Sequence, residues 1–265
     1  MTTATAAEDA LWARTYHPAP AGAGQLVCFP HAGGSASFFY PLSAELAAAA
    51  EVVAVQYPGR QDRHGEPTPT DINVLADLVY RALRPRLAAR PTTLFGHSMG
   101  SVVAFEVARR MEADGLAPVR LFASGRGGPS VPRTGTVHLR DDAGIVAELD
   151  GLAGTDAVLL ADEDFLRMVM PAIRADYTAV ETYRCGPDAV LRCPITALTG
   201  DSDPKAPHEE VLVWGRHTSG DFELRRFPGG HFYLVDEADA VTDVLRRHLV
   251  TATTATDPAG QRTAP

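Results

Sequence analysis

Residues 92–100 read Thr-Thr-Leu-Phe-Gly-His-Ser-Met-Gly, and this stretch decides the fold. The β-branched and apolar run Thr92–Phe95 predicts a strand, and Ser101–Ala113 has the apolar spacing of a helix. The turn between them carries the pattern G-x-S-x-G, with Ser98 at its centre. The two glycines leave room where strand and helix approach, which places the serine at the tip of a strained turn. The pattern also occurs by chance in glycine-bounded loops, so a nucleophilic role for the serine depends on partners elsewhere.

Short apolar runs alternate with longer helical patterns along the chain, which is the signature of an α/β fold with a mostly parallel sheet. The expected strands are Gln25–Pro30, Val52–Tyr57, Thr92–Phe95, Val119–Ser124, Pro194–Thr199 and Phe222–Phe227. The expected helices between them are Phe38–Ala50, Asn73–Ala89, Ser101–Ala113, Pro207–Thr218 and Glu237–Leu249. A length of 265 residues with 45% hydrophobic residues fits one domain, residues 1–265, with an insertion. We expect the first ten residues to be frayed and the tail at about 251–265 to be disordered.

About seventy residues separate the strand that ends near Ser124 from the strand that starts at Pro194, far more than a connecting loop needs. We expect an insertion at about 130–190 with two helices, Asp141–Leu149 and Asp162–Tyr183. The second helix has an apolar stripe and further apolar residues off that stripe, and Pro171 is expected to kink it. A well-packed helix inside a large domain is one explanation. We favour a helical lid with one face on the core and another on an apolar substrate chamber.

A serine hydroxyl needs a base to accept its proton, and the base needs a third group to orient it. The best base is His231, which follows two glycines after the last expected strand, at the sheet edge where catalytic groups gather. The acid is expected after the preceding strand, where Asp201 and Asp203 both lie. We select Asp203, three residues beyond Gly200, and expect Asp201 to cap the turn. The order Ser98, Asp203, His231 is that of the α/β-hydrolases, and the sequence predicts this fold.

Residues 29–39, Phe-Pro-His-Ala-Gly-Gly-Ser-Ala-Ser-Phe-Phe, follow the first strong strand. In this architecture that loop supplies one N–H group to an oxyanion hole, and the residue after the nucleophile supplies another. We expect the donors to be Ala32 and Met99. A phosphate-binding glycine loop is the alternative, but the stretch lacks both a lysine and the G-x-G-x-x-G spacing.

The remaining histidines carry weaker signals. The side chain of His97 is expected to point away from that of Ser98 and to pack or hydrogen-bond locally. The others are expected to be solvated in loops or on polar helix faces: His17, His64, His138, His208, His217 and His248.

The formal net charge of −9 argues against a nucleic-acid partner, which needs a concentrated basic surface. Three cysteines without CxxC or metal-ligand spacing indicate structural thiols in a reduced compartment, and we expect no metal. The chain has no signal-peptide pattern and no apolar run of membrane-spanning length. We therefore expect a cytoplasmic protein with no membrane partner.

Taken together, the motifs resemble those of type II thioesterases, the stand-alone α/β-hydrolases that accompany polyketide synthases and nonribosomal peptide synthetases. The resemblance covers most of the chain and rests on FPHAGGSASFF (29–39), QYPGRQDR (56–63), LFGHSMGS (94–101), LFASGRGGP (121–129), MPAIRADYTAVETYR (170–184), TGDSDP (199–204) and FPGGHFYL (227–234). It implies hydrolysis of acyl groups from the phosphopantetheine arm of acyl or peptidyl carrier domains, often to clear misprimed or stalled units. It also implies a helical lid over the site. The expected chemistry needs no cofactor of its own.

Two other enzymatic functions fit the same residues: a general carboxylesterase, and a medium-chain fatty acyl thioesterase that acts in chain release. A catalytically silent binding protein with a hydrolase fold is the alternative outside enzymology. A carrier domain is usually acidic, so docking would need local positive charge, for which the candidates are Arg60, Arg63, Arg126 and Arg133. Solvated surface arginines are the commoner explanation, and Arg60 is also a candidate for hydrogen bonding within its own loop.

Overall fold

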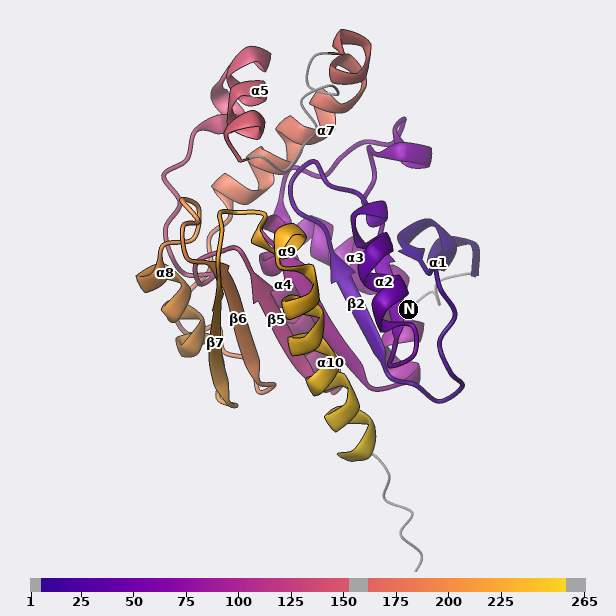
Figure 1. Ribbon diagram of the computed structural model, residues 1–265. Coiled ribbons are helices and arrows are strands. Elements are labelled where there is room, and N and C mark those ends of the chain that lie inside the picture. The colour runs from indigo at the N-terminus through magenta and orange to yellow at the C-terminus, as the bar shows by residue number, and fades with distance from the viewer. Residues whose placement is uncertain (1–5, 153–161, 256–265) are drawn as a thin grey trace, which may run out of the picture.

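The computed structural model describes residues 6–152 and 162–255 and confirms the predicted α/β fold (Figure 1). Within these residues, seven strands form one sheet in the order β1-β3-β2-β4-β5-β6-β7, and all neighbours are parallel except β1 and β3. The strands are β1 Ala13–Arg14, β2 Gln25–Phe29, β3 Glu51–Val55, β4 Thr92–His97, β5 Arg120–Ser124, β6 Ile195–Gly200 and β7 Phe222–Phe227. The α-helices are α1 Ala6–Trp12, α2 Tyr40–Leu46, α3 Ile72–Ala89, α4 Met99–Ala113, α5 Asp142–Gly151, α7 Glu163–Thr182, α8 His208–Leu212, α9 Tyr233–Asp236 and α10 Ala238–Ala255. Short 3-10 helices are η1 Ala36–Phe39, η2 Gln61–Arg63, η3 Val137–Leu139 and η4 Val213–His217.

Helices cover both faces of the sheet, which explains why the central strands are apolar along their whole length. In β2, Val27 and Phe29 pack into the layer that contains α3 and α4. The alternate residues Leu26 and Cys28 pack into the opposite layer, which contains α2 and α10. All five residues of β2 are buried as a result.

Strand β4 lies at the centre of the sheet, between β2 and β5. The register pairs Phe29 of β2 with Gly96 and Ser124 of β5 with His97, so the three strands end at nearly the same level. The turn at residues 96–100, which contains Ser98, therefore lies at the middle of the carboxyl edge of the sheet, where parallel α/β folds place their ligands.

The described part of the insertion contains η3, α5 and α7, close to the two helices that the sequence predicts. In Figure 1, α5 and α7 rise beyond the carboxyl edge of the sheet, on the side where β4 and β5 end. Helix α7 continues through Pro171, and the kink expected at this residue stays a prediction. The predicted stripe faces inward: Leu166, Val169, Ile173, Tyr177 and Val180 all line a cavity between α7 and the sheet edge.

Two expectations about the periphery are wrong. The first residues are not frayed from end to end: α1 starts at Ala6, Trp12 is buried under the Arg63 guanidinium, and β1 adds an antiparallel edge strand. The single helices expected at 38–50 and 207–218 each combine a 3-10 turn with a short α-helix. Helix α10 is described to Ala255, residues 256–265 lie outside the described part, and the disorder expected at about 251–265 stays a prediction. None of the described helices is long and apolar enough to cross a membrane.

Candidate active site

The turn at Ser98 has the strained geometry that its glycines predict. Ser98 has a φ of 53°, one of two positive values among the non-glycine residues that the structure describes. A Cβ on Gly96 would lie 2.1 Å from the carbonyl oxygen of Gly100, and a Cβ on Gly100 would lie 2.0 Å from that of Phe29. The Ser98 N–H donates to the carbonyl oxygen of Ser124 at 2.8 Å, which fixes the turn against β5. The serine therefore heads α4 in a conformation set by the surrounding backbone.

His231 lies between Ser98 and Asp203. Its Nε2 is 3.0 Å from the Ser98 Oγ, and its Nδ1 is 2.9 Å from an Asp203 carboxylate oxygen. Asp203 also accepts the Lys205 N–H at 2.8 Å, and both His231 and Asp203 are buried. The other candidate carboxylate, Asp201, instead accepts the Gly229 N–H at 3.1 Å and holds the turn before the histidine. The structure thus brings together the three residues selected from the sequence.

Residues 31–34 form a tight turn after β2, closed by a 3.0 Å hydrogen bond from the Gly34 N–H to the His31 carbonyl oxygen. Gly33 has a φ of 75° at the third position, as in a type II turn, which favours glycine there. Ala32 lines the same cavity as Ser98, and Met99 follows Ser98 as the first residue of α4. Within the described residues, the Ala32 N–H has no hydrogen-bond acceptor. This N–H is a free donor on the wall of the site.

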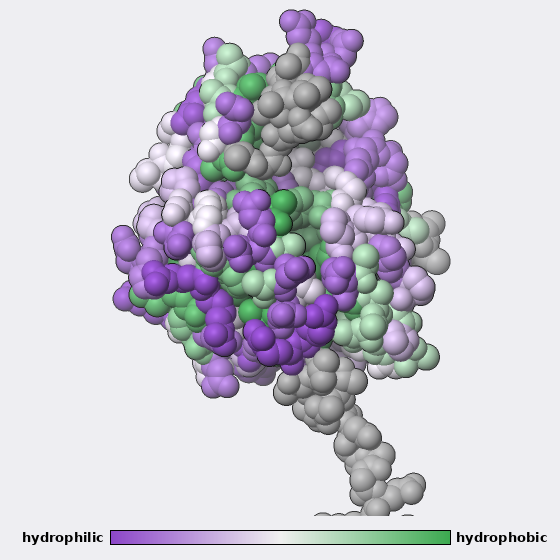
Figure 2. Space-filling view, in the orientation of Figure 1, coloured by the Kyte–Doolittle hydropathy of each residue, from purple (hydrophilic) through white to green (hydrophobic). Residues whose placement is uncertain are grey.

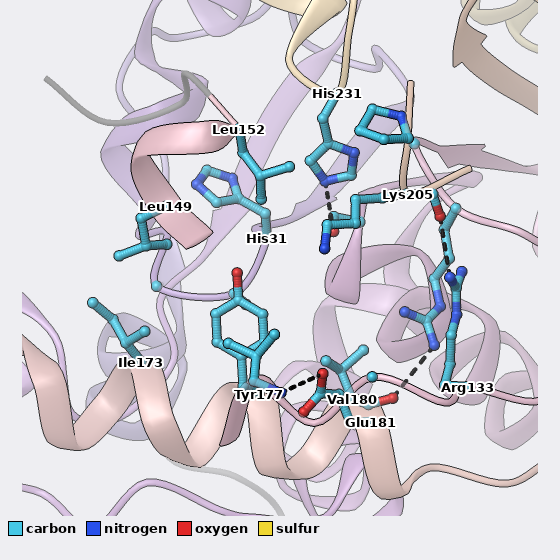
Figure 3. Close-up of a pocket in the computed structure, with 18 of the residues that line it drawn as sticks. His31, Arg133, Leu149, Leu152, Ile173, Tyr177, Val180, Glu181, Lys205 and His231 are labelled. Carbon is cyan, nitrogen blue, oxygen red and sulfur yellow. Dashed lines mark hydrogen bonds between the residues drawn. The ribbon is translucent and has the colours of Figure 1, made fainter. Parts of the chain in front are cut away.

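A cavity of about 330 Å³ opens beside Ser98 and His231. Figure 3 shows Ile173, Tyr177 and Val180 of α7 along one side, with His31 and His231 opposite them. Leu149 and Leu152 extend the apolar wall, whereas Arg133 and Lys205 lie on a more polar side. In the space-filling view, apolar surface shows in a recess near the middle of this face, bordered by hydrophilic side chains (Figure 2). The site suits a mainly apolar group that reaches the serine from this cavity.

Two further histidines, His97 and His31, lie near His231. The sequence predicted where the His97 side chain points but predicted no role for His31. The His97 ring is fully buried 5.0 Å from that of His231, and its Nδ1 is 2.9 Å from the Ser124 Oγ, away from the Ser98 side chain as expected. The second, His31, lines the cavity and has no predicted role. Burial, then the positive charge of a protonated His231, lowers the pKa of His97 well below its usual value and that of His31 to about 3. Both rings are neutral near pH 7. His231 is the ring of the three that lies within hydrogen-bond distance of the Ser98 hydroxyl.

The arginines proposed for docking are mostly buried, which contradicts that role for three of them. Arg60 donates to the Pro58 carbonyl oxygen at 2.7 Å, which confirms the alternative that it hydrogen-bonds within its own loop, and it also pairs with Asp176 of α7. Arg63 stacks on Trp12 and pairs with Glu66, and Arg126 is buried in the cavity wall, where burial lowers its pKa to about 9. Arg133 alone of the four keeps a partly exposed side chain, about 20%, and lies 3.7 Å from Glu210.

Two histidines expected in solvent are also placed differently. His217 is fully buried between the Ser130 hydroxyl and the Ala189 carbonyl oxygen, at 2.7 Å from each. His138 contacts the Glu181 carboxylate at 2.5 Å, so it belongs to the packing of η3 on α7. Among the described residues, no cluster of three or more His, Cys, Asp or Glu side chains has the arrangement of a metal site.

Comparison with known proteins adds the family. Residues 24–249 match the model of the thioesterase domain. The chain is 55% identical to a thioesterase of cadicidin biosynthesis from Streptomyces griseus, over 92% of this chain and 68% of that protein. It is 48% identical to thioesterase PikA5 of Streptomyces venezuelae, over 94% of this chain and 89% of that one. Among solved structures, the type II thioesterase BorB of the borrelidin cluster superposes with a TM-score of 0.84 at 48% identity, covering 94% of this chain and 100% of BorB. The chain therefore belongs to the thioesterase family, in its type II group, and is a hydrolase with the α/β-hydrolase fold.

Proposed function

We propose that this thioesterase hydrolyses acyl groups from the phosphopantetheine arm of acyl or peptidyl carrier domains, in a polyketide synthase or nonribosomal peptide synthetase system. The single observation that carries the chemistry is the position of His231, within hydrogen-bond distance of both Ser98 and Asp203 at the wall of an apolar cavity. The substrate class is supported by the similarity to BorB, a type II thioesterase from the borrelidin biosynthetic cluster, and to YbtT, a type II thioesterase from the yersiniabactin nonribosomal peptide synthetase and polyketide synthase pathway (33% identity, TM-score 0.83). Removal of misprimed or stalled units is the biological role that fits a stand-alone enzyme of this group.

In the proposed mechanism, His231 accepts the proton of the Ser98 hydroxyl as its oxygen attacks the thioester carbonyl carbon. The N–H groups of Ala32 and Met99 donate to the oxygen that becomes negative, aided by the N-terminal end of α4. The carbon–sulfur bond then breaks, and His231 returns the proton to the departing pantetheine thiol. A water molecule, deprotonated by His231, attacks the acyl-serine and releases the carboxylic acid and the free hydroxyl.

Asp203 contributes by holding the Nδ1–H of His231, which leaves Nε2 free as the base toward Ser98. The negative charge of the carboxylate also stabilises the imidazolium that forms in each half-reaction. Every proton and every leaving group in this scheme is accounted for by these side chains, water and the substrate. We therefore propose that the enzyme uses no metal and no cofactor of its own.

Replacing Ser98 with alanine tests this proposal. We expect Ser98→Ala to lower kcat on an acyl-carrier thioester by at least about 10³-fold, since the covalent route is lost. Circular dichroism and the melting temperature check that the variant is folded. Activity within a few fold of the wild type would overturn the assignment.

Two further measurements separate the alternative functions. Rates on an acyl-carrier thioester and on the matching oxygen ester distinguish a carrier thioesterase from a general carboxylesterase, and a series of acyl lengths tests a role in releasing medium-chain fatty acids. A fluorophosphonate probe should label Ser98 in the wild type and leave Ser98→Ala unlabelled. Absence of labelling in the folded wild type would instead favour a silent binding protein.

A further inference from the structure

The turn at residues 31–34 is held by a side chain from the insertion, far away in sequence. Asp176 of α7 accepts the Gly33 N–H at 2.7 Å and pairs with the Arg60 guanidinium. Ile173, one turn earlier on α7, packs so closely on Gly33 that an added Cβ there would lie 3.1 Å from its side chain. Helix α7 thus rests directly on the turn that carries the Ala32 N–H.

Arg60 holds the same turn from a second direction. Its Nε donates to the Gly34 carbonyl oxygen at 2.8 Å, and a terminal nitrogen donates to the Pro58 carbonyl oxygen at 2.7 Å. Its guanidinium also lies 5.1 Å from the centre of the Tyr57 ring, in cation–π range. Asp176 and Arg60 together fix an N–H and a carbonyl group in consecutive residues, Gly33 and Gly34.

Stability alone explains this pair poorly. Arg60 and Asp176 are about 94% and 99% buried, and the second Asp176 oxygen has no hydrogen-bond partner among the described residues. The desolvation of two charges offsets most of the attraction between them, so a buried ion pair is weak evidence for stability. What the pair does fix is the peptide between Ala32 and Gly33, which carries the Gly33 N–H. The Ala32 N–H belongs to the preceding peptide, between His31 and Ala32, so the pair holds it by fixing the residue that the two peptides share.

We propose that Asp176 and Arg60 are positioning residues that hold the Ala32 N–H in its place in the oxyanion hole. This inference rests on the function proposed above, because it assumes that the Ala32 N–H contacts the reacting oxygen. The Met99 donor is set by the backbone of the nucleophile turn. The Ala32 donor is set by a carboxylate of the insertion, so α7 completes the hole as well as walling the cavity.

Kinetics on a soluble acyl-pantetheine thioester test the proposal. We expect Asp176→Ala to lower kcat by about 10- to 100-fold with KM within about 3-fold, because a displaced donor is lost mainly in the transition state. Asp176→Asn keeps the side-chain length and an oxygen that can accept the Gly33 N–H. It should therefore recover at least about a third of the logarithmic loss in kcat.

A boronic acid that forms a tetrahedral adduct with Ser98 gives a second readout that depends on the same donor. Its affinity should fall in Asp176→Ala by a factor close to the fall in kcat. A change in KM with an unchanged kcat would overturn the proposal. An unchanged boronate affinity beside a reduced kcat would also overturn it. If Asp176→Ala does not fold, the same pair of measurements on Asp176→Asn decides: both kcat and boronate affinity must fall together.

Arg174→Ala is the matched control. Arg174 lies on the same helix and anchors it to the segment before α5, through the His138 and Arg140 carbonyl oxygens and the Asp142 carboxylate. It contacts no residue of the turn, so kcat should stay within about two-fold of the wild type. An equal loss in Arg174→Ala would mean that any loosening of α7 lowers kcat, and would contradict a specific role of Asp176.

The outcomes also separate this inference from the proposed function. If Ser98→Ala retains activity, the proposed function fails and the boronate has no serine to bind. If activity depends on Ser98 while folded Asp176→Ala keeps its kcat, only the positioning role fails.

Discussion

The two N–H groups proposed as oxyanion donors, those of Met99 and Ala32, are positioned by different parts of the molecule. The turn at 96–100 lies between paired strands, and the atoms nearest to an added Cβ on Gly96 or Gly100 are backbone atoms. The turn at 31–34 follows the neighbouring strand, but side chains from distant segments hold it: Asp176 binds Gly33, Arg60 binds Gly34, and Gln56 binds Ala36 just beyond. Of the two proposed oxyanion donors, Met99 is therefore positioned by the backbone of neighbouring strands, and Ala32 by side chains from distant segments.

Among the variants that test this difference, Gly100→Ala is expected to have the largest effect on stability. The new Cβ would lie 2.0 Å from the Phe29 carbonyl oxygen, which cannot move away without breaking the pairing of β2 with β4. We expect a loss of about 4 kcal/mol or more in the free energy of unfolding, measured by urea denaturation. Gly65→Ala is the control, because nothing lies within 4 Å of its added Cβ. A Gly100→Ala protein with wild-type stability would show that the turn is not fixed by its backbone.

The same division explains which parts of the site the sequence predicted. Ser98, Asp203 and His231 follow the ends of strands, so the strand order and a few residues of spacing place them. The choice of Asp203 over Asp201 needed only the distance from the end of β6. The partnership of Arg60 with Asp176 joins residues 116 positions apart and has no local pattern, so the sequence leaves Arg60 open between surface docking and hydrogen bonding within its own loop. His217 was misplaced for the same reason, since its partners come from other segments.

A smaller effect is expected from Gln56→Leu, which removes a side-chain support of the second region. The buried Gln56 amide accepts the Ala36 N–H at 2.8 Å and donates to the Arg60 carbonyl oxygen at 3.2 Å. Leaving these buried backbone groups unpaired should cost about 1–3 kcal/mol of unfolding free energy. Gln56 holds Ala36, two residues beyond the turn at 31–34, and also Arg60, which donates to Gly34 of that turn. We therefore also expect kcat to fall by about 3- to 10-fold.

Gln25→Leu is the matched control for that prediction. Gln25 is equally buried and its amide donates to the Arg86 carbonyl oxygen and the Thr92 hydroxyl, but at the amino end of β2. It should lose a similar amount of stability while the kcat of the folded enzyme is unchanged. If both variants lower kcat alike, the effect of Gln56 is a general loss of stability rather than a displaced turn.

The smallest expected effect concerns one histidine in each region: His97 in the turn at 96–100, and His31 in the turn at 31–34. Burial lowers the pKa of each in the folded state, so below about pH 6.5 the unfolded chain binds protons that the folded chain does not. The contribution of these two histidines to the free energy of unfolding is therefore fully present above pH 6.5. It decreases as the pH falls, by at most about 1.4 kcal/mol per pH unit for each histidine.

Removing one of the two groups should reduce that slope without abolishing it. We expect His97→Asn to flatten the dependence of unfolding free energy on pH between 6.5 and 4.5, leaving the contributions of His31 and of His217, whose pKa is also lowered by burial. The comparison uses the slope rather than the level, because the loss of the His97 bond to Ser124 lowers stability at every pH. Gly65→Ala again provides the control variant, because it changes no titratable group and its added Cβ meets nothing within 4 Å, so it should keep the wild-type slope. An unchanged slope in His97→Asn would mean that this ring takes up its proton as readily in the folded protein as in the unfolded chain, and that the nucleophile turn is more open to water than its packing indicates.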